Sequence, residues 1–299
     1  VDFTLTPHIG VALSAVDASS AEALLEHART AANEARRVAS TQPTFYSEAM
    51  QVRSLSRLDL GRELRDAIAN RDIRFRYVGR HDLQTGRQVA SVAYLCWHHP
   101  LRGEIPPSEF LRIAVATGLA VDLSRMALES MADDFAAQSQ HWAPDMRISF
   151  GPLRDHIFHE DFVGDVERVL AMNVLPPERL ELRIAEKAFV ARETHALRAL
   201  ERRGVQLVVD EAARAVASLS SLASAPISGL QLDRSFTTAL LHDETANKVC
   251  RATFGIARAL QLAPMAAGVD NQQIREALLE MGCRYGTGDL FAHAEKDRH

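Results

Sequence analysis

Two adjacent acids, Asp210 and Glu211, end a short apolar run from Val205 to Val209. Such a run is typical of a buried β-strand, and carboxylates at the carboxyl end of a buried strand can hold a divalent cation or act as a general base. A simpler interpretation is that Asp210 caps a following helix and Glu211 lies in its first turn, near the positive end of the helix dipole. The chain on both sides of the pair favours the first interpretation.

Composition limits the classes of protein to consider. The chain has 299 residues, of which 47% are hydrophobic and 24% charged, enough for one barrel-sized domain and a small attachment. Its net charge of -5 disfavours bulk binding of nucleic acid. No apolar run approaches the roughly 20 residues that span a bilayer, and no signal peptide opens the sequence. We therefore expect a cytoplasmic chain without a membrane segment or a nucleic-acid partner.

The three cysteines, Cys96, Cys250 and Cys283, lie far apart and lack the spacing of metal ligands. They predict buried thiols in a reducing compartment rather than disulfides. Two histidines, His156 and His159, lie three residues apart on a predicted helix and could form part of a metal site. An exposed polar helix end is the favoured interpretation of that pair.

From residue 55 onward, short apolar runs alternate with amphipathic segments, which is the pattern of an α/β fold. Predicted strands lie near Ile73–Val78, Val89–Leu95, Met146–Phe150, Leu180–Ile184, Val205–Val209, Gly229–Leu232, Pro264–Ala267 and Arg284–Gly286. Predicted helices between the later strands lie near 154–172, 191–203, 213–224, 244–261 and 271–281. Eight strands without an early glycine-rich phosphate turn predict a TIM-like (β/α)8 barrel, with functional residues just after the strands.

The segment before the barrel is short. Two β-like runs, Phe3–Thr6 and Ile9–Ser14, precede a helix expected from Ser19/Ser20 to Arg37, and residues 1–39 resemble the C-terminal hairpin and helix of diguanylate cyclase (GGDEF) domains. The polar residues 40–54 are predicted to be a linker, residues 55–292 the barrel and residues 293–299 a tail.

The barrel segment carries a stronger resemblance. It contains Leu83-Gln84-Thr85-Gly86-Arg87, Trp97-His98-His99-Pro100, Gly103 to Phe110, Leu180 to Glu186, Gly204 to Glu211, Leu230 to Phe236 and Ala266 to Asp270. These runs resemble, in order and spacing, the motifs of EAL domains, the cyclic di-GMP phosphodiesterases. The resemblance implies a barrel whose carboxyl-terminal mouth holds two divalent cations that activate a water.

Most of the family's functional positions are changed in this sequence. The positions that the resemblance implies for metal ligands, the phosphate-clamping arginine and the water-positioning lysine hold Val92, Cys96, Ser149, Arg183, Gln231, Ala267 and Thr287. Acids remain at Asp210, Glu211, Glu186, Asp233 and Asp270. We therefore expect no catalytic residue and no magnesium or manganese cofactor, and Arg183 is predicted to form an ion pair with Asp210 or Glu211.

The implied role is a catalytically inactive EAL-like regulatory or scaffold module in bacterial cyclic di-GMP signalling. Its expected partner is a protein, namely another EAL or GGDEF protein, a PilZ-type domain or a second copy. A non-hydrolysing cyclic di-GMP receptor is the alternative, with Arg183, Arg214 and Arg284 as possible phosphate contacts. A residual one-metal phosphodiesterase using Asp210, Glu211 and Glu186 is a third hypothesis.

Overall fold

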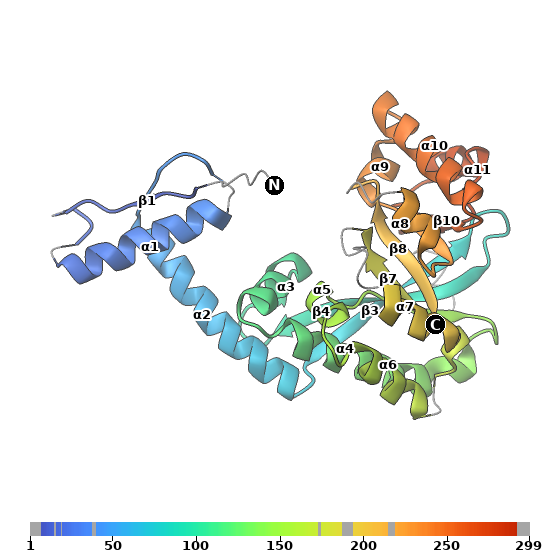
Figure 1. Cartoon of the computed structure of the whole chain (residues 1–299), viewed down its shortest axis with the longest axis horizontal. Coiled ribbons are helices and arrows are strands. Elements are labelled where there is room, and N and C mark those ends of the chain that lie inside the picture. The colour runs from blue at the N-terminus through green and yellow to red at the C-terminus, as the bar shows by residue number, and fades with distance from the viewer. Residues whose placement is uncertain are drawn as a thin grey trace. The chain divides into compact units, whose positions relative to one another are not determined.

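The structure is a computed structural model that describes residues 7–14, 16–18, 20–37, 40–172, 175–186, 194–214 and 219–291, and the side chains of all of these except 37, 51–58, 141 and 194. Its contacts divide the chain into a smaller unit, Val1–Ala67, and a larger unit, Ile68–His299 (Figure 1). The predicted tail, 293–299, lies outside the described residues.

The smaller unit is built on two short strands and a helix. Strands β1 (Gly10–Val11) and β2 (Thr44–Phe45) pair in parallel, and helix α1 (Ala21–Arg37) connects them. A side chain at Gly10 would lie about 2.1 Å from the Ala28 carbonyl oxygen, so glycine is needed where the strand meets the helix. The rings of His27 and Tyr46 stack with centroids 4.0 Å apart.

One prediction about this segment needs correction and another stays a prediction. The predicted hairpin is untested, because its first run, Phe3–Thr6, lies outside the described residues; within them, Gly10–Val11 of the second run pairs in parallel with Thr44–Phe45 beyond the helix. Residues 40–54 are not a plain linker, since they contain β2 and the start of helix α2 (Glu48–Ala69). Helix α2 begins inside the predicted linker because residues 48–51, Glu-Ala-Met-Gln, are strong helix formers.

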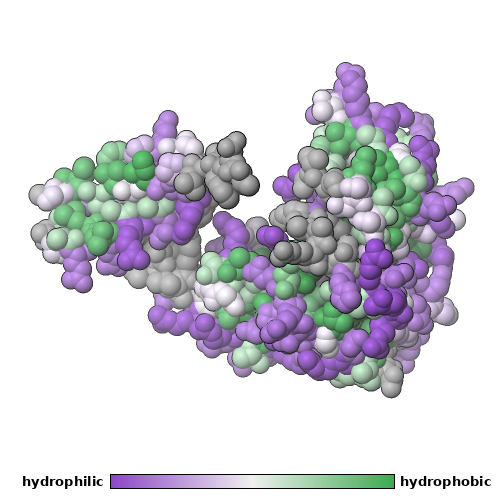
Figure 2. All heavy atoms as spheres, in the orientation of Figure 1, coloured by the Kyte–Doolittle hydropathy of each residue, from purple (hydrophilic) through white to green (hydrophobic). Residues whose placement is uncertain are grey.

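Apolar side chains are exposed on the smaller unit, as the green regions on its visible face in Figure 2 indicate. The large hydrophobic residues with the greatest exposed fractions there are Val16, Leu25, Phe45, Ile9 and Leu13. Two strands and one helix offer too little interior to bury such side chains. This surface is therefore suited to contact with another protein surface.

The larger unit is a closed barrel of eight strands, β3 (Ile73–Asp82), β4 (Gln88–His99), β6 (Arg147–Phe150), β7 (Leu180–Ala185), β8 (Gln206–Ala212), β9 (Gly229–Leu232), β10 (Ala263–Ala267) and β11 (Tyr285–Thr287). Their order is β3-β11-β10-β9-β8-β7-β6-β4, and pairing of β3 with β4 closes the ring. The short strand β5 (Gly103–Ile105) extends β4 outside it. The predicted TIM-like barrel is confirmed.

One strand departs from an all-parallel barrel. Strand β3 is antiparallel to both of its neighbours, β4 and β11, whereas the remaining pairs in the ring are parallel. The cause is the connection from β3 to β4, which spans residues 83–87 only. A parallel connection needs a crossover of about a dozen residues or more, so a turn this short reverses the chain.

Helices cover the outside of the barrel (Figure 1). They are α3 (Pro107–Ala116), α4 (Ala120–Gln138), α5 (Arg154–Ile157), α6 (Phe162–Ala171), α7 (Thr194–Arg202), α8 (Leu219–Ser224), α9 (Arg234–Ala239), α10 (Glu244–Ala259) and α11 (Gln272–Glu280). The predicted helix 154–172 is two helices, and the predicted helix 213–224 is described only as α8, because 215–218 lie outside the described residues.

The apolar core lies between the strands and the outer helices, and it fixes which strand residues face inward. Val209 and Leu230 pack with Leu222 of α8 and Ala257 of α10, and Leu232 packs with α10 and α11. Successive side chains of a strand point to opposite faces. Asp210 of β8 and Gln231 of β9 therefore point into the barrel.

The cysteine prediction is confirmed in its structural part, since Cys96, Cys250 and Cys283 are free and buried. Burial raises the pKa of the Cys250 thiol to about 11, which keeps it protonated at neutral pH. Along the described residues, no helix combines the length and the apolar character that crossing a membrane requires.

The histidine pair differs from its favoured interpretation. His156 is fully buried rather than at an exposed helix end. Its Nδ1 lies 3.0 Å from Ser124 Oγ and its Nε2 lies 3.0 Å from Asp165 Oδ2. Arg125 Nε donates to the same carboxylate oxygen at 2.7 Å. This buried network joins α4, α5 and α6 beside the barrel.

We predict that replacing His156 by Phe lowers the free energy of unfolding by about 2 kcal/mol, because buried polar groups of Ser124 and Asp165 lose a partner. Burial also lowers the pKa of His156 in the folded protein, although Asp165 opposes the shift. The unfolded chain therefore takes up a proton near pH 6.5 that the folded protein does not, so stability falls as the pH drops from about 6.5 toward the lower folded pKa.

Urea unfolding at pH 7.5 and pH 5.5 measures both effects. The matched control is His159→Phe, at a half-buried position in the same segment, which should change stability by less than about 1 kcal/mol. The network has no such role if the two variants lose equal stability, or if His156→Phe keeps the full pH dependence of the original chain.

Candidate functional site at the carboxyl end of the barrel

Asp210 lies at the carboxyl end of β8, inside the barrel. The strand continues to Ala212 instead of ending at Val209, and its register with β9 shifts between these residues. Glu211 has a positive φ of 55° and its backbone N–H donates to Asp210 Oδ1 at 2.8 Å. Asp210 also accepts from two other side chains and is thus part of a side-chain network rather than a helix cap.

The first of these side chains is Arg183 of β7. Its Nη1 donates to Asp210 Oδ2 at 2.9 Å, its Nη2 donates to the Ala93 carbonyl oxygen at 3.3 Å, and its guanidinium carbon lies 5.0 Å from the centre of the Tyr94 ring. The Arg183 side chain is only 7% exposed. The predicted ion pair between Arg183 and Asp210 is confirmed.

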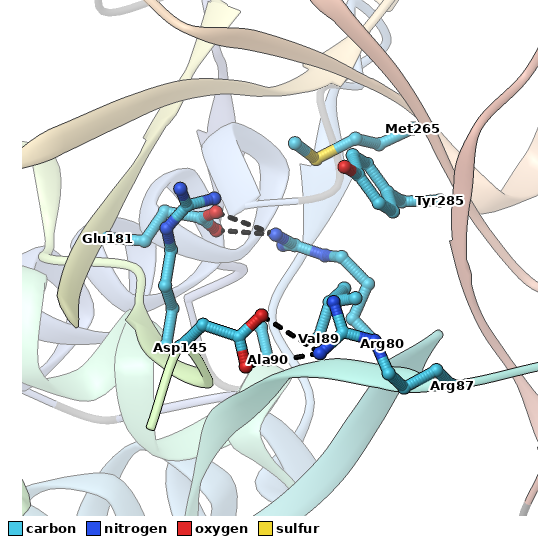
Figure 3. A pocket seen from close by; sticks show the side chains of 9 residues that line it. Arg80, Arg87, Val89, Ala90, Asp145, Glu181, Met265 and Tyr285 are labelled. Carbon is cyan, nitrogen blue, oxygen red and sulfur yellow. Dashed lines mark hydrogen bonds and ion pairs between the residues drawn. The ribbon is translucent and has the colours of Figure 1, made fainter. Parts of the chain in front are cut away.

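The second is Gln231 of β9, which connects the ion pair to a deeper one. Gln231 Nε2 donates to Asp210 Oδ1 at 2.7 Å, and Gln231 Oε1 accepts from Arg80 Nη2 at 3.2 Å. Arg80 Nη1 donates to both oxygens of Glu181 at 2.7 Å (Figure 3). Ser149 Oγ donates to Glu181 Oε1 at 2.6 Å. A continuous polar network therefore runs through the barrel.

The charges of this network compensate one another. Burial alone would raise the pKa of Glu181, but Arg80 and Ser149 outweigh it, so the pKa lies below its ordinary value. Burial alone would lower the pKa of Arg183, but Asp210, Tyr94 and Glu181 raise it. The network contains two arginines and two carboxylates, so its formal charges sum to zero.

Arg80, Glu181 and Tyr94 were not among the sequence-predicted site residues. A signal existed for Glu181, because it lies two residues before Arg183 on the same strand and must share its face. No comparable signal exists for Arg80, which is 101 positions away from its partner.

The other acids are distributed around the rim. Asp233 caps α9 by accepting from Ser235 N at 2.9 Å, and Asp270 pairs with Arg234 at 2.8 Å. Glu186 is buried after β7. These acids and Glu211 do not converge on Asp210 in the part of the chain that the structure describes, where no three His, Cys, Asp or Glu side chains could together hold a metal ion.

The remaining changed positions hold side chains that are poor ligands for magnesium. Val92 and Cys96 of β4 are buried and apolar, and Thr287 of β11 is buried. Ala267, at the end of β10, supplies no ligand atom in its side chain.

The arginines considered as phosphate contacts do not lie together. Arg214 is at the carboxyl end of β8, with Nη1 3.7 Å from Asp233 Oδ2 and a side chain 60% exposed. Arg284 precedes β11 and is thus at the amino-terminal end of the barrel, 3.8 Å from Asp82. Arg284 cannot join Arg183 and Arg214 around one ligand, because it lies at the opposite end of the barrel.

Comparison with known proteins agrees with this architecture. The profile of the EAL domain matches residues 61–294. The chain belongs to the EAL domain family.

Similar proteins include an uncharacterized signaling protein of Caulobacter vibrioides, 30% identical over 89% of this chain and 33% of its own length. The bifunctional diguanylate cyclase/cyclic di-GMP phosphodiesterase MucR of Pseudomonas aeruginosa is 27% identical over 96% of this chain and 42% of its own. The chain thus spans less than half the length of these curated relatives. Among solved structures, the PaMucR phosphodiesterase in complex with c-di-GMP has a TM-score of 0.74 and 27% identity, covering 78% of this chain and 95% of that one.

The EAL resemblance implies two divalent cations at this end of the barrel, and the residues present do not fit them. Magnesium takes about six oxygen ligands in near-octahedral geometry. Both oxygens of Asp210 are occupied by hydrogen bonds from Arg183, Gln231 and the Glu211 backbone. The Arg183 guanidinium adds a fixed positive charge where the resemblance implies a metal-binding carboxylate.

We predict that Asp210→Asn lowers the free energy of unfolding by about 3 kcal/mol, because it leaves the buried Arg183 without a counter-charge. Asp270→Asn is the matched control, since it breaks an aspartate–arginine pair whose arginine, Arg234, is 58% exposed, and it should cost less than about 1 kcal/mol. Urea unfolding at pH 7 gives both values.

A double variant tests the pairing itself. Arg183→Met combined with Asp210→Asn should be more stable than Asp210→Asn alone, because no unpaired charge remains. Equal losses for Asp210→Asn and Asp270→Asn, or additive losses in the double variant, would show that the pair is not energetically coupled.

Proposed function

We propose that this chain is an EAL-like module that does not hydrolyse cyclic di-GMP and acts as a regulatory or scaffold part of a cyclic di-GMP signalling protein. Membership of the EAL family and similarity to a bifunctional diguanylate cyclase/cyclic di-GMP phosphodiesterase support the signalling context. The loss of hydrolysis is supported by one observation, the Arg183–Asp210 ion pair bridged by Gln231.

The chemistry of hydrolysis explains why this observation matters. A metal-activated water requires a cation with an open coordination position near the phosphodiester. The Arg183 guanidinium satisfies Asp210 but can neither bind a water as a Lewis acid nor lower its pKa as a metal does. A residual one-metal phosphodiesterase is disfavoured for the same reason, since it would need the oxygens of Asp210 that Arg183 and Gln231 already engage.

We predict that the purified chain forms no linear product from cyclic di-GMP with magnesium or manganese, because no two-metal centre can assemble around Asp210. Product is measured by chromatography beside an active EAL phosphodiesterase, and the Asp210→Asn variant sets the background. Metal-dependent product well above that background, removed by a chelator, would overturn the proposal.

Action through a protein partner agrees with the surface of the smaller unit. Its exposed Val16, Leu25 and Phe45 are large apolar side chains that protein–protein contact would remove from water. Partners of the proposed kind are another EAL or GGDEF protein, a PilZ-type domain or a second copy of this chain.

A cyclic di-GMP receptor without hydrolysis is the second candidate, and similarity to a structure solved with c-di-GMP favours it. Against it, the positions that the resemblance gives to a phosphate-clamping arginine and an early glutamine hold Cys96 and Val78. Arg183 is already engaged by Asp210 and Ala93. Loss of such charged contacts weakens binding by roughly a hundredfold.

Calorimetric titration of cyclic di-GMP, with and without magnesium, separates the two candidates. We predict no saturable heat at nucleotide concentrations up to about 1 mM, where a favourable free energy would be only about 4 kcal/mol. Micromolar binding that Arg183→Met abolishes, and that Arg112→Gln on the outer helix α3 retains, would make the chain a receptor instead.

A further inference from the structure

A pocket of about 130 Å³ lies at the amino-terminal end of the barrel, opposite Asp210 and Arg183. It is lined by Arg80, Arg87, Val89, Ala90, Asp145 and Arg147, together with Glu181, Met265 and Tyr285. Most of these residues are at or near the starts of the parallel strands, or in the turn before them. The candidate site around Asp210 is at the other, carboxyl-terminal end of the barrel.

The pocket has an excess of positive charge. Its lining holds three arginines and two acids. Arg87 is paired with Asp145, at 2.8 and 3.1 Å, and Arg80 is paired with Glu181, as the dashed lines in Figure 3 show. The third arginine, Arg147, is exposed at the start of β6, and within the described part of the chain no hydrogen bond or salt bridge of its side chain is found, so the lining carries one excess positive charge.

The pocket also has a buried donor without an acceptor. Arg80 is 2% exposed, and its Nε has no hydrogen-bond partner within the described residues. A buried N–H left unpaired costs about 1–3 kcal/mol, which a bound acceptor would recover. Arg80 is among the residues that line the pocket, and in Figure 3 its side chain lies between Glu181 on one side and Met265 and Tyr285 on the other.

These observations define a ligand. It has one negative charge to match the excess and acceptor oxygens for the N–H donors of Arg147. The pocket volume of about 130 Å³ suits a small ligand. A planar guanidinium such as that of Arg147 presents paired N–H donors that match an oxyanion. We propose that this pocket binds a small oxyanion, of the phosphate or carboxylate type.

The pocket is separate from the site around Asp210, but two of its lining residues belong to the polar network of that site. Glu181 and Arg80 border the pocket, and Arg80 also donates to Gln231, which donates to Asp210. An anion at Arg80 would therefore meet the same hydrogen-bonded chain that ends at the Arg183–Asp210 pair.

Calorimetric titrations of inorganic phosphate and of acetate into the full chain, at constant ionic strength set with chloride, test the proposal. We expect saturable binding of at least one of the two, and a tenfold to hundredfold weaker Kd for Arg147→Gln, as expected for loss of a charged hydrogen bond. The matched control is Arg112→Gln, which removes the same charge from the exposed face of α3 and should bind as the original chain does.

The outcomes are clear in either direction. Weakened binding in Arg147→Gln and unchanged binding in Arg112→Gln would support the site, and the stronger of the two anions would identify its type. Arg147→Lys keeps the charge without the paired donors and should bind with intermediate affinity. No saturable heat with either anion, or equal affinity in Arg147→Gln and the original chain, would overturn the proposal.

Discussion

The interior of this barrel depends on the neutralisation of buried charge. Moving an isolated ion from water into a protein interior is costly, so each buried guanidinium needs a carboxylate within hydrogen-bonding distance. Arg80 and Arg183 meet that need through Glu181 and Asp210, and Gln231 bridges the two pairs. The strand order makes this possible, since β7, β8 and β9 are consecutive around the ring. Asp210 thus has a structural reason to be an acid in a site that does not fit a metal.

The strands of the barrel could be predicted from the sequence to within a few residues, because each is a short apolar run with turn-forming or helical sequence on both sides. The antiparallel direction of β3 was not foreseen, although the short connection at 83–87 requires it. The smaller unit was predicted less well. Its strands are two residues long, and the polar composition of residues 40–54 conceals both β2 and the start of α2.

Side-chain pairs of the site that join neighbouring strands could be predicted from the sequence. Pairs that cross the interior of the closed barrel could not. The Arg183–Asp210 pair follows from two adjacent strands whose ends meet at one edge. The Arg80–Glu181 pair joins β3, the first strand of the barrel, to β7 across the interior, and no local pattern specifies which residues meet there. His156 shows the same limit, since its polar surroundings in sequence gave no indication that α4 and α6 would bury it.

An arginine and a divalent cation can stabilise the same carboxylates and still support different chemistry. Both supply positive charge, so a barrel can retain its fold when one replaces the other. A cation has coordination positions that a water or a phosphate oxygen can enter, and it lowers the pKa of that water. A guanidinium has directional N–H donors and a pKa above about 12, so it offers hydrogen bonds without an exchangeable site. Arg183 donates through Nη1 to Asp210 and through Nη2 to the Ala93 carbonyl oxygen. The pair therefore gives the barrel its electrostatic balance, and under the proposed function it stands in place of the cation on which metal-dependent hydrolysis depends.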